Sequence, residues 1–549
     1  MNQSAAIPEA FTPKLASTLR EGYGREEFKA DLTAGLTVAI VALPLAMALG
    51  IASGAGPKEG LVTAVVAGIL ISALGGSRVQ IGGPTGAFVV IVAGVIAEHG
   101  LAGLLLATLM AGAMLIVAGY AGVGRLMRFV PMPVVTGFTS GIAVIIAVTQ
   151  LPDFLGLQLE GVPSEFIAKL SSYGSALNTA NWAALGLSVA TLASIILLRR
   201  YLPRVPAYLV AIVGASLSAV LLRLPIETVG DRFPQMPTGL PTPALPIFSL
   251  SLARDVMPSA FVIAFLAGIE ALLSATVADG MTGRRHRSGQ ELVGMGVANI
   301  ASALFGGLPA TGAIARTATN IRAGGRTPVA GIAHALFLLL FMVAVGGWLA
   351  YVPMAALAAV LLMVAWGMSE ADRFVALVRT DAGERAILLL TFLLTILVDL
   401  TVAIGVGVTL AALLFMTRMS ETAGLVAVDV TEEPELRAAL PEGVEVFRFT
   451  GPLFFGVASE MLEALRRMGQ RPRAIILRME RVPYIDATGA NALATFVRQA
   501  RHGGTDVWLC GLKPGPREFL ARGEQPFAGA RHVAKWSTAL KTLKKVSGK

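Results

Sequence analysis

GPTGAF at residues 83–88 and PATGAI at residues 309–314 are two copies of one short motif. Each follows another shared motif, SALGG at residues 72–76 and SALFGG at residues 302–307. Such matched segments indicate an internal repeat, which is the sequence trace of many membrane proteins built from two related halves. Because proline removes an N–H donor and glycine permits non-helical backbone, we predict that each copy of the motif interrupts a helix.

The segments around these motifs predict a membrane protein. The chain is 55% hydrophobic and only 14% charged, against about 25% charged residues in soluble domains. A spanning helix needs about 20 mostly apolar residues, and the region 31–417 supplies fourteen apolar segments, two of them short and interrupted by glycine. The predicted spans are 31–54, 58–76, 84–97, 101–121, 130–150, 181–198, 205–222, 257–280, 290–306, 312–323, 328–350, 353–369, 385–399 and 401–417.

The repeat divides these spans into two halves of seven. An odd number of spans inverts the second half relative to the first, so the interrupted third and tenth spans should enter from opposite faces and meet near mid-membrane. Irregular backbone is tolerated there only where it is buried in protein or lines a cavity. Two helix N-termini would then direct their N–H groups at one cavity, which is an anion site by geometry. The alternative is that proline and glycine merely kink packed helices.

Charge predicts the topology and the domain limits. The net charge of +9 arises from arginines between apolar segments, which we interpret as topology signals rather than a nucleic-acid surface; both termini are then cytoplasmic. Along the chain we predict a cytoplasmic segment at 1–30 and a transport domain at 31–417, with repeats at about 31–222 and 257–417. A linker at 418–439 and a soluble cytoplasmic domain at 440–549 follow.

Two ionisable residues lie inside predicted spans, where a charge costs at least ~2.5 kcal/mol. Arg316 falls in the first turn of the second interrupted helix and would favour an anion; a structural ion pair or snorkelling is the alternative. Glu270 lies midway along the span 257–280, so its carboxyl could titrate between two conformations of a carrier. The alternatives for Glu270 are a permanent salt bridge with Arg316 or a role as a helix-capping partner.

The C-terminal domain reads as a small α/β layer. Strands are predicted at 444–450, 474–477 and 507–510, with helices at 458–468 and 490–500 between them. No phosphate loop, metal cluster or nucleophile elbow occurs in the sequence, and the single cysteine excludes a cysteine-built metal site, so we expect no enzyme activity, metal or cofactor.

Three motifs give the chain a family resemblance. GPTGA at 83–87, VADGMTG at 277–283 and TGAIART at 311–317 together resemble the SulP, or sulfate permease, anion transporters, which carry a C-terminal STAS domain. The resemblance covers nearly the whole chain. It implies an α-helical membrane protein with fourteen spans in two inverted seven-span repeats, divided into core and gate subdomains, and commonly a homodimer.

The resemblance also implies site residues. The substrate would lie between the third and tenth spans, lined by Thr85, Gly86, Ala87, Ala313, Ile314, Ala315 and Arg316. Glu270 would occupy the cation-coupling position; sodium-coupled bicarbonate carriers are expected to have Asp there, so Glu favours a proton. Leu45 replaces the Gln found in many relatives, which leaves the identity of the oxyanion open. In the STAS domain, Thr488 matches a position that is phosphorylated in bacterial relatives of the anti-sigma antagonist type.

We therefore predict a proton-coupled secondary carrier for sulfate, bicarbonate or a dicarboxylate, working by alternating access in the plasma (inner) membrane. Expected partners are the lipid bilayer, the small anion, a coupling proton or sodium, a second copy of the chain and a cytoplasmic protein at the STAS domain, with no nucleic acid. A sodium-coupled bicarbonate symporter and an anion exchanger or channel on the same fold are the nearest alternatives. A STAS-based membrane signalling protein is a different class, and Arg316 argues against a nucleobase permease.

Overall fold

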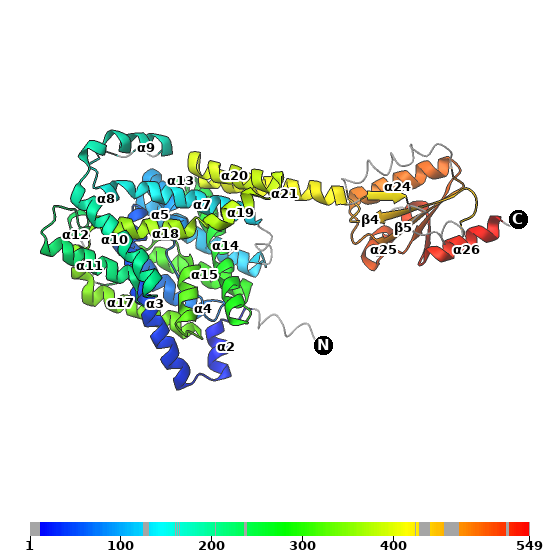
Figure 1. Ribbon diagram of the computed structural model, residues 1–549. Helices are drawn as coiled ribbons and strands as arrows, with labels where there is room; N and C mark the ends of the chain where they lie inside the picture. The colour runs from blue at the N-terminus through cyan, green and yellow to red at the C-terminus, as the bar shows by residue number, and fades with distance from the viewer. Residues whose placement is uncertain are drawn as a thin grey trace. The chain divides into compact units, whose positions relative to one another are not determined.

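The computed structural model describes residues 11–124, 131–159, 161, 163, 165–203, 205–234, 239–422, 424–427, 440–454, 472–522 and 526–547. The chain forms two compact units, Met1–Val408 and Thr409–Lys549. The first unit is helical and the second is a sheet with helices (Figure 1).

Helices occupy the predicted spans of the first unit. They are α3 (Arg25–Ala52), α4 (Pro57–Leu74), η2 with α5 (Gly86–Phe88, Val89–Tyr120), α7 (Met132–Thr149), α10 (Trp182–Tyr201), α11 (Ala207–Leu221), α14 (Met257–Thr282), α15 (Ser288–Leu304), α16 (Ile314–Arg322), α17 (Pro328–Val345), α18 (Met354–Met368), α20 (Ala382–Leu397) and α21 (Leu400–Thr422). Within the described residues, nine helices are long and apolar enough to cross a membrane. The total of fourteen spans stays a prediction.

Element α5 covers two predicted spans, 84–97 and 101–121. Gly100 within it has φ 65° and ψ −175°, so two helices meet there at a break rather than forming one continuous rod. Glycine adopts this positive φ without the steric cost that a Cβ would add. The predicted gap between these two spans, at residues 98–100, therefore coincides with the break.

The helices pack into two groups. The first group contains α3, α4, α5, α14, α15, α16 and α17, and the second contains α7, α10, α11, α18 and α20. The crossing of α5 and α15 shows how the first group is held. A Cβ on Gly112 would lie 2.6 Å from the Gly296 carbonyl oxygen, and one on Gly296 would lie 2.5 Å from that of Gly112. Small residues of this kind let membrane helices approach until their backbones touch.

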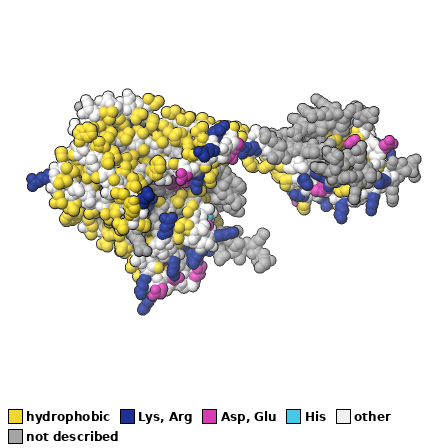
Figure 2. Space-filling model, viewed as in Figure 1, with side chains coloured by type: hydrophobic (Ala, Val, Ile, Leu, Met, Phe, Trp, Pro, Cys, Tyr) yellow, Lys and Arg dark blue, Asp and Glu magenta, His cyan; other side chains and the backbone are white. Residues whose placement is uncertain are grey.

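The outer surface of the first unit is apolar. Figure 2 shows hydrophobic side chains over much of its visible face. Trp182, Val213, Leu217, Leu336 and Leu340 are among the large apolar side chains that point outward from α10, α11 and α17. A water-soluble protein rarely exposes so large a contiguous apolar surface, so this unit is the membrane part of a multi-pass protein.

Two long polar connections carry short helices. The predicted loops 151–180 and 223–256 contain α8 (Leu151–Leu155), α9 (Phe166–Ser175), α12 (Val229–Arg232) and α13 (Leu250–Asp255). Arg232 joins the two loops by donating to Asp153 at 2.7 Å and to Glu227. Burial opposes the charge, but these hydrogen bonds outweigh it and raise the pKa of Arg232. The loops are therefore fastened to each other.

The second unit is an α/β layer, as predicted. Its strands are β3 (Gly424–Ala427), β4 (Val444–Thr450), β5 (Ala474–Arg481), β6 (Asp506–Cys510) and β7 (Arg531–Val533), in the order β3-β4-β5-β6-β7. β3 pairs antiparallel with β4, and the other neighbouring strands are parallel. Phe447 and Phe449 face the cluster that includes residues of α24 (Ala487–His502), whereas Val444 and Val446 face that of α26 (Trp536–Ser547). Both faces of β4 are therefore buried.

The predicted linker at 418–439 is wrong in its first part. Helix α21 continues to Thr422, and residues 424–427 form the edge strand β3 against β4. The short apolar run Gly424–Ala427 gains ladder pairing with β4 that composition alone does not reveal. Residues 428–439 and the predicted helix at 458–468 lie outside the described residues.

Candidate functional site

The two copies of the opening motif meet in the folded chain. Strand β1 (Gly82–Gly83) pairs antiparallel with β2 (Thr311–Gly312), with Gly82 opposite Gly312 and Gly83 opposite Thr311. The Ala313 N–H extends the ladder by donating to the Ile81 carbonyl at 2.8 Å. The prediction that the third and tenth segments come together is confirmed, and η2 and α16 begin directly after the paired strands.

Buried polar side chains hold the irregular backbone that leads into β2. The Asn299 amide donates to the Ala310 carbonyl at 2.9 Å and accepts from the Ala310 N–H at 2.9 Å. The Thr63 hydroxyl accepts from the Leu308 N–H at 2.6 Å. Because no water is available inside a bilayer, such groups must be paired within the protein. The sequence analysis missed Asn299 and Thr63; an isolated asparagine inside an apolar span was the available signal.

Arg316 crosses from the tenth segment to the third. It lies on the first turn of α16, is only 6% exposed, and donates from Nη2 to the Pro84 carbonyl at 2.8 Å. A Cβ on Gly83 would lie 2.7 Å from Nη1 of Arg316, so the space beside the guanidinium depends on glycine. Nη1 itself has no hydrogen-bond partner in the part of the chain that the structure describes. One donor of a buried positive charge thus remains free beside both motifs.

Glu270 contacts the third segment rather than Arg316. Its Oε2 accepts a hydrogen bond from the Thr85 hydroxyl at 2.9 Å. No ion pair joins Glu270 to Arg316 among the described residues, so the alternative of a salt bridge between them is wrong. On the same helix, the Ala267 carbonyl accepts from the Thr311 hydroxyl at 2.8 Å. Helix α14 therefore touches both motifs, through Glu270 and Ala267.

The predicted site residues divide into an accessible and a buried set. Ile314 and Ala315 are exposed, and Thr85 and Glu270 are half-buried. Gly86, Ala87, Ala313 and Arg316 are buried. Ile314 and Ala315 are therefore accessible at the start of α16, whereas the neighbouring Arg316 is buried.

Gly86 is covered by the second group of helices. A methyl group added at Gly86 would overlap Met368 Sδ at the end of α18 and would lie 3.5 Å from Ile146 of α7. The start of the third-span helix is therefore in direct contact with helices outside its own group.

Comparison with known proteins agrees with these features. A model of the sulfate permease family matches residues 28–391, and a model of the STAS domain matches residues 435–525. The chain belongs to the sulfate permease family. It is therefore an anion transporter with a STAS domain and not an enzyme.

Individual relatives of this sulfate permease family member cover most of its length. YvdB of Bacillus subtilis, which is named as a sulfate transporter, is 40% identical over 91% of this chain and 94% of its own. The bicarbonate transporter BicA of Picosynechococcus is 32% identical over 90% of each chain.

Solved structures support the fold. The transmembrane domain of a cyanobacterial BicA aligns with a TM-score of 0.63 and 32% identity, over 69% of this chain and 98% of that one. Murine Slc26a9 in an inward-facing state aligns with a TM-score of 0.85 over 95% of this chain and 91% of its own. At 18% identity the latter shows the fold alone.

The turn that opens α24 in the STAS domain contains two polar residues, Asp486 and Thr488, and Asp486 has a clear structural role. Asp486 caps α24, because its Oδ1 accepts from the Gly489 N–H at 2.7 Å. Thr488 is exposed on the first turn of the same helix. Capping thus explains Asp486, and phosphorylation of Thr488 stays a prediction.

Proposed function

We propose that this protein is a proton-coupled secondary transporter of a small anion, namely sulfate, bicarbonate or a dicarboxylate, and that it works by alternating access. The observation that carries the proposal is the β1–β2 pair, which brings two helix starts together beside Arg316. Thr85, Gly86, Ala87, Ala313, Ile314, Ala315 and Arg316 would line the anion site.

Electrostatics favours an anion at this place. The N-terminus of α16 carries unpaired N–H groups and the positive end of the helix dipole, and the third-span helix adds a second such start. Arg316 adds a full positive charge beside both helix starts. A small oxyanion in front of Thr85 and Ala315 would meet partial charges whose geometry is already fixed, so little reorganisation is needed on binding.

The packing supports alternating access. The helices form two groups, and the third-span helix start contacts the second group through Met368 and Ile146. A site on the boundary between two bodies can be opened to one side or the other by moving one body against the other. These groups would act as the core and gate subdomains.

Glu270 is the proposed coupling residue. A hydroxyl both donates and accepts hydrogen bonds, so Thr85 can donate to an ionised Glu270 and accept from a protonated one. The anion site and the proton would then share Thr85. A sodium-coupled bicarbonate symporter is the second candidate, because the BicA relatives are named as bicarbonate transporters.

We further propose a plasma (inner) membrane location, with the N-terminal segment and the STAS domain cytoplasmic. Arg199, Arg200, Arg284, Arg285 and Arg326 would all lie on that side under the positive-inside rule. A homodimer and a cytoplasmic protein that binds the STAS domain belong to the same proposal.

Uptake by proteoliposomes tests the function. Purified protein should accumulate one of labelled sulfate, bicarbonate and succinate when a pH gradient is imposed, and should do so without sodium. A one-unit gradient is worth about 1.4 kcal/mol, or about tenfold accumulation for one proton per anion. Accumulation that needs a sodium gradient would favour the second candidate, and equilibration without accumulation would favour an exchanger or channel.

The contact at Gly86 offers a test of alternating access. Gly86→Ala should slow uptake, because the added methyl overlaps Met368 in the conformation described here. Overpacking costs about 1–3 kcal/mol, and the flexible Met368 side chain places this case at about 1 kcal/mol, so this conformation should become roughly five-fold rarer. Met368→Ala in the same chain should restore uptake.

The matched control is Gly94→Ala on the same helix, where a Cβ would have no neighbour within 4 Å. It should leave uptake unchanged. If the Gly86 and Met368 substitutions act additively in a double-mutant cycle, their contact does not control the transport cycle.

A further inference from the structure

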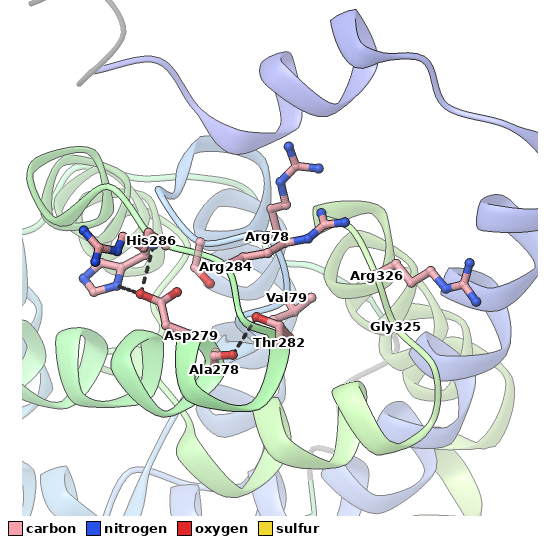
Figure 3. A pocket seen from close by; sticks show the side chains of 11 residues that line it. Arg78, Val79, Ala278, Asp279, Thr282, Arg284, His286, Gly325 and Arg326 are labelled. Carbon is pink, nitrogen blue, oxygen red and sulfur yellow. Dashed lines mark hydrogen bonds and ion pairs between the residues drawn. The ribbon is translucent and has the colours of Figure 1, made fainter. Parts of the chain in front are cut away.

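A polar cavity lies apart from the two motifs. Its volume is about 360 Å³, and it is formed by the segment after α4, the end of α14, the α14–α15 connection and the segment after α16. The ionisable lining residues are Arg78, Arg284, Arg285, Arg326, Asp279 and His286. Figure 3 shows Arg78 and Arg284 between the Asp279–His286 pair and Arg326. Four arginines from three separate segments therefore line one cavity, and Arg284, Arg285 and Arg326 are exposed.

The single carboxylate of the cavity is already engaged. Asp279 Oδ2 lies 2.7 Å from Nδ1 of His286 and accepts from the His286 N–H at 3.1 Å. The other ring nitrogen of His286 lies 2.9 Å from the Ser288 hydroxyl. This network fixes the α14–α15 connection, and it leaves Asp279 directed at the histidine rather than at the arginines.

Among the described residues, one of the lining arginines forms an ion pair, with a residue of the N-terminal segment. The Asp31 carboxylate also lies beside this face and accepts from the Arg326 N–H at 2.7 Å. Arg78 pairs with Glu21, which is an exposed residue at the end of α2 (Lys14–Glu21). That hydrogen bond lowers the pKa of Glu21. Among the described residues, Arg284, Arg285 and Arg326 form no ion pair. Three exposed arginines without an ion pair therefore make the rim of the cavity basic.

Membrane topology explains part of this charge but not its arrangement. The positive-inside rule requires basic residues in the loops of one face, and Arg199 and Arg200 at the end of α10 satisfy it without lining this cavity. It does not require loops from distant parts of the sequence to bring their arginines together. Like charges held close repel one another, and a bound anion would offset that repulsion.

We propose that this cavity binds a phosphate-bearing anion and is a site separate from the transport site. Arginine presents several donors in a planar fork that suits phosphate oxygens. The cavity volume of about 360 Å³ is large enough for a tetrahedral oxyanion. The ligand class is a soluble di- or oligophosphate or the headgroup phosphate of an anionic lipid.

The cavity is connected to the transport site through α16. Asn320 on that helix donates to the Val79 carbonyl at 2.9 Å, and Val79 and Gly325 both line the cavity. Arg316 lies on the first turn of the same short helix. A ligand in the cavity would therefore contact segments that run directly to both motifs, and it would compete with Glu21 for Arg78.

Binding of inorganic pyrophosphate to the full chain tests the proposal independently of transport. Titration calorimetry on protein in phosphatidylcholine nanodiscs should show saturable binding. Arg284→Gln with Arg326→Gln should weaken it more than about tenfold, because charged hydrogen bonds are lost. Arg199→Gln with Arg200→Gln removes the same charge elsewhere and should leave it unchanged. Glu21→Gln should strengthen it several-fold by freeing Arg78.

Two further arms separate the ligand sources and the sites. If nanodiscs containing phosphatidylglycerol weaken pyrophosphate binding in the wild type, a lipid headgroup occupies the site; if they do not, the ligand is soluble. Arg316→Ala should leave pyrophosphate binding intact. Absence of saturable binding in neutral nanodiscs, equal losses in both arginine pairs, or loss of binding in Arg316→Ala would each overturn the proposal. Thermal unfolding of every variant confirms that it is folded.

Discussion

Anion binding is expected to weaken by roughly ten- to 100-fold when Arg316 is replaced by alanine. Hydrogen bonds to charged groups contribute about 1.5–3 kcal/mol, which corresponds to that range in Kd. The buried guanidinium has a free Nη1 beside both motifs, and its charge stands behind the N-terminus of α16. Calorimetric titration of the transported anion, with uptake at saturating and limiting concentrations, measures the loss.

The substitution should leave the protein folded. The Pro84 carbonyl would lose its donor, but a buried charge with an unused donor is removed at the same time, so the two effects partly cancel. Arg322→Ala on the same helix is the matched control, because Arg322 is exposed in the last turn. Arg316→Lys keeps the charge and should retain more binding than alanine. Unchanged affinity in Arg316→Ala would remove Arg316 from the anion site.

The repeated motif was sufficient to predict the centre of the fold. Proline and glycine interrupt the helices in both halves, and the interrupted backbone can be paired inside a membrane only with protein groups. The β1–β2 ladder is the pairing that results. The predicted boundary between the spans 84–97 and 101–121 also coincides with a break in α5, where Gly100 adopts a conformation that other residues avoid.

The orientation of Arg316 could not be predicted in the same way. Sequence places Ile314, Ala315 and Arg316 on one turn, but successive residues point about 100° apart around a helix. Which of them is exposed depends on how α16 is rotated. The Thr317 hydroxyl, which accepts from the Ile81 N–H at 3.0 Å and from Ser274 at 3.2 Å, fixes that rotation. Ile314 and Ala315 are exposed as a result, and Arg316 turns to Pro84.

The grouping of the loop arginines could not be predicted either. Arginines between apolar segments are interpreted as topology signals, and nothing in the spacing of Arg78, Arg284 and Arg326 joins them. The folded chain places them around one cavity. A similar limit applies to β3, whose four residues become a strand only because β4 offers an edge.

Glu270→Gln is expected to abolish proton-driven accumulation while preserving exchange of the anion. Glutamine keeps the size and hydrogen-bonding capacity of a protonated glutamate but cannot release a proton. Its carbonyl can still accept from the Thr85 hydroxyl, which lies 2.9 Å from Glu270 Oε2, so the third segment should remain in place. Under a one-unit pH gradient, the accumulation ratio should fall from about ten for one proton per anion to about one.

Counterflow in the same vesicles separates coupling from damage. Exchange of internal unlabelled anion for external label needs no net proton movement, so it should continue in Glu270→Gln if only coupling is lost. Glu98→Gln, which removes an exposed carboxyl on α5, should retain wild-type accumulation. Thr85→Val should impair both processes, because Thr85 belongs to the proposed anion site and also contacts Glu270. A Glu270→Gln protein that still concentrates its anion under a pH gradient would show that the proton is carried elsewhere.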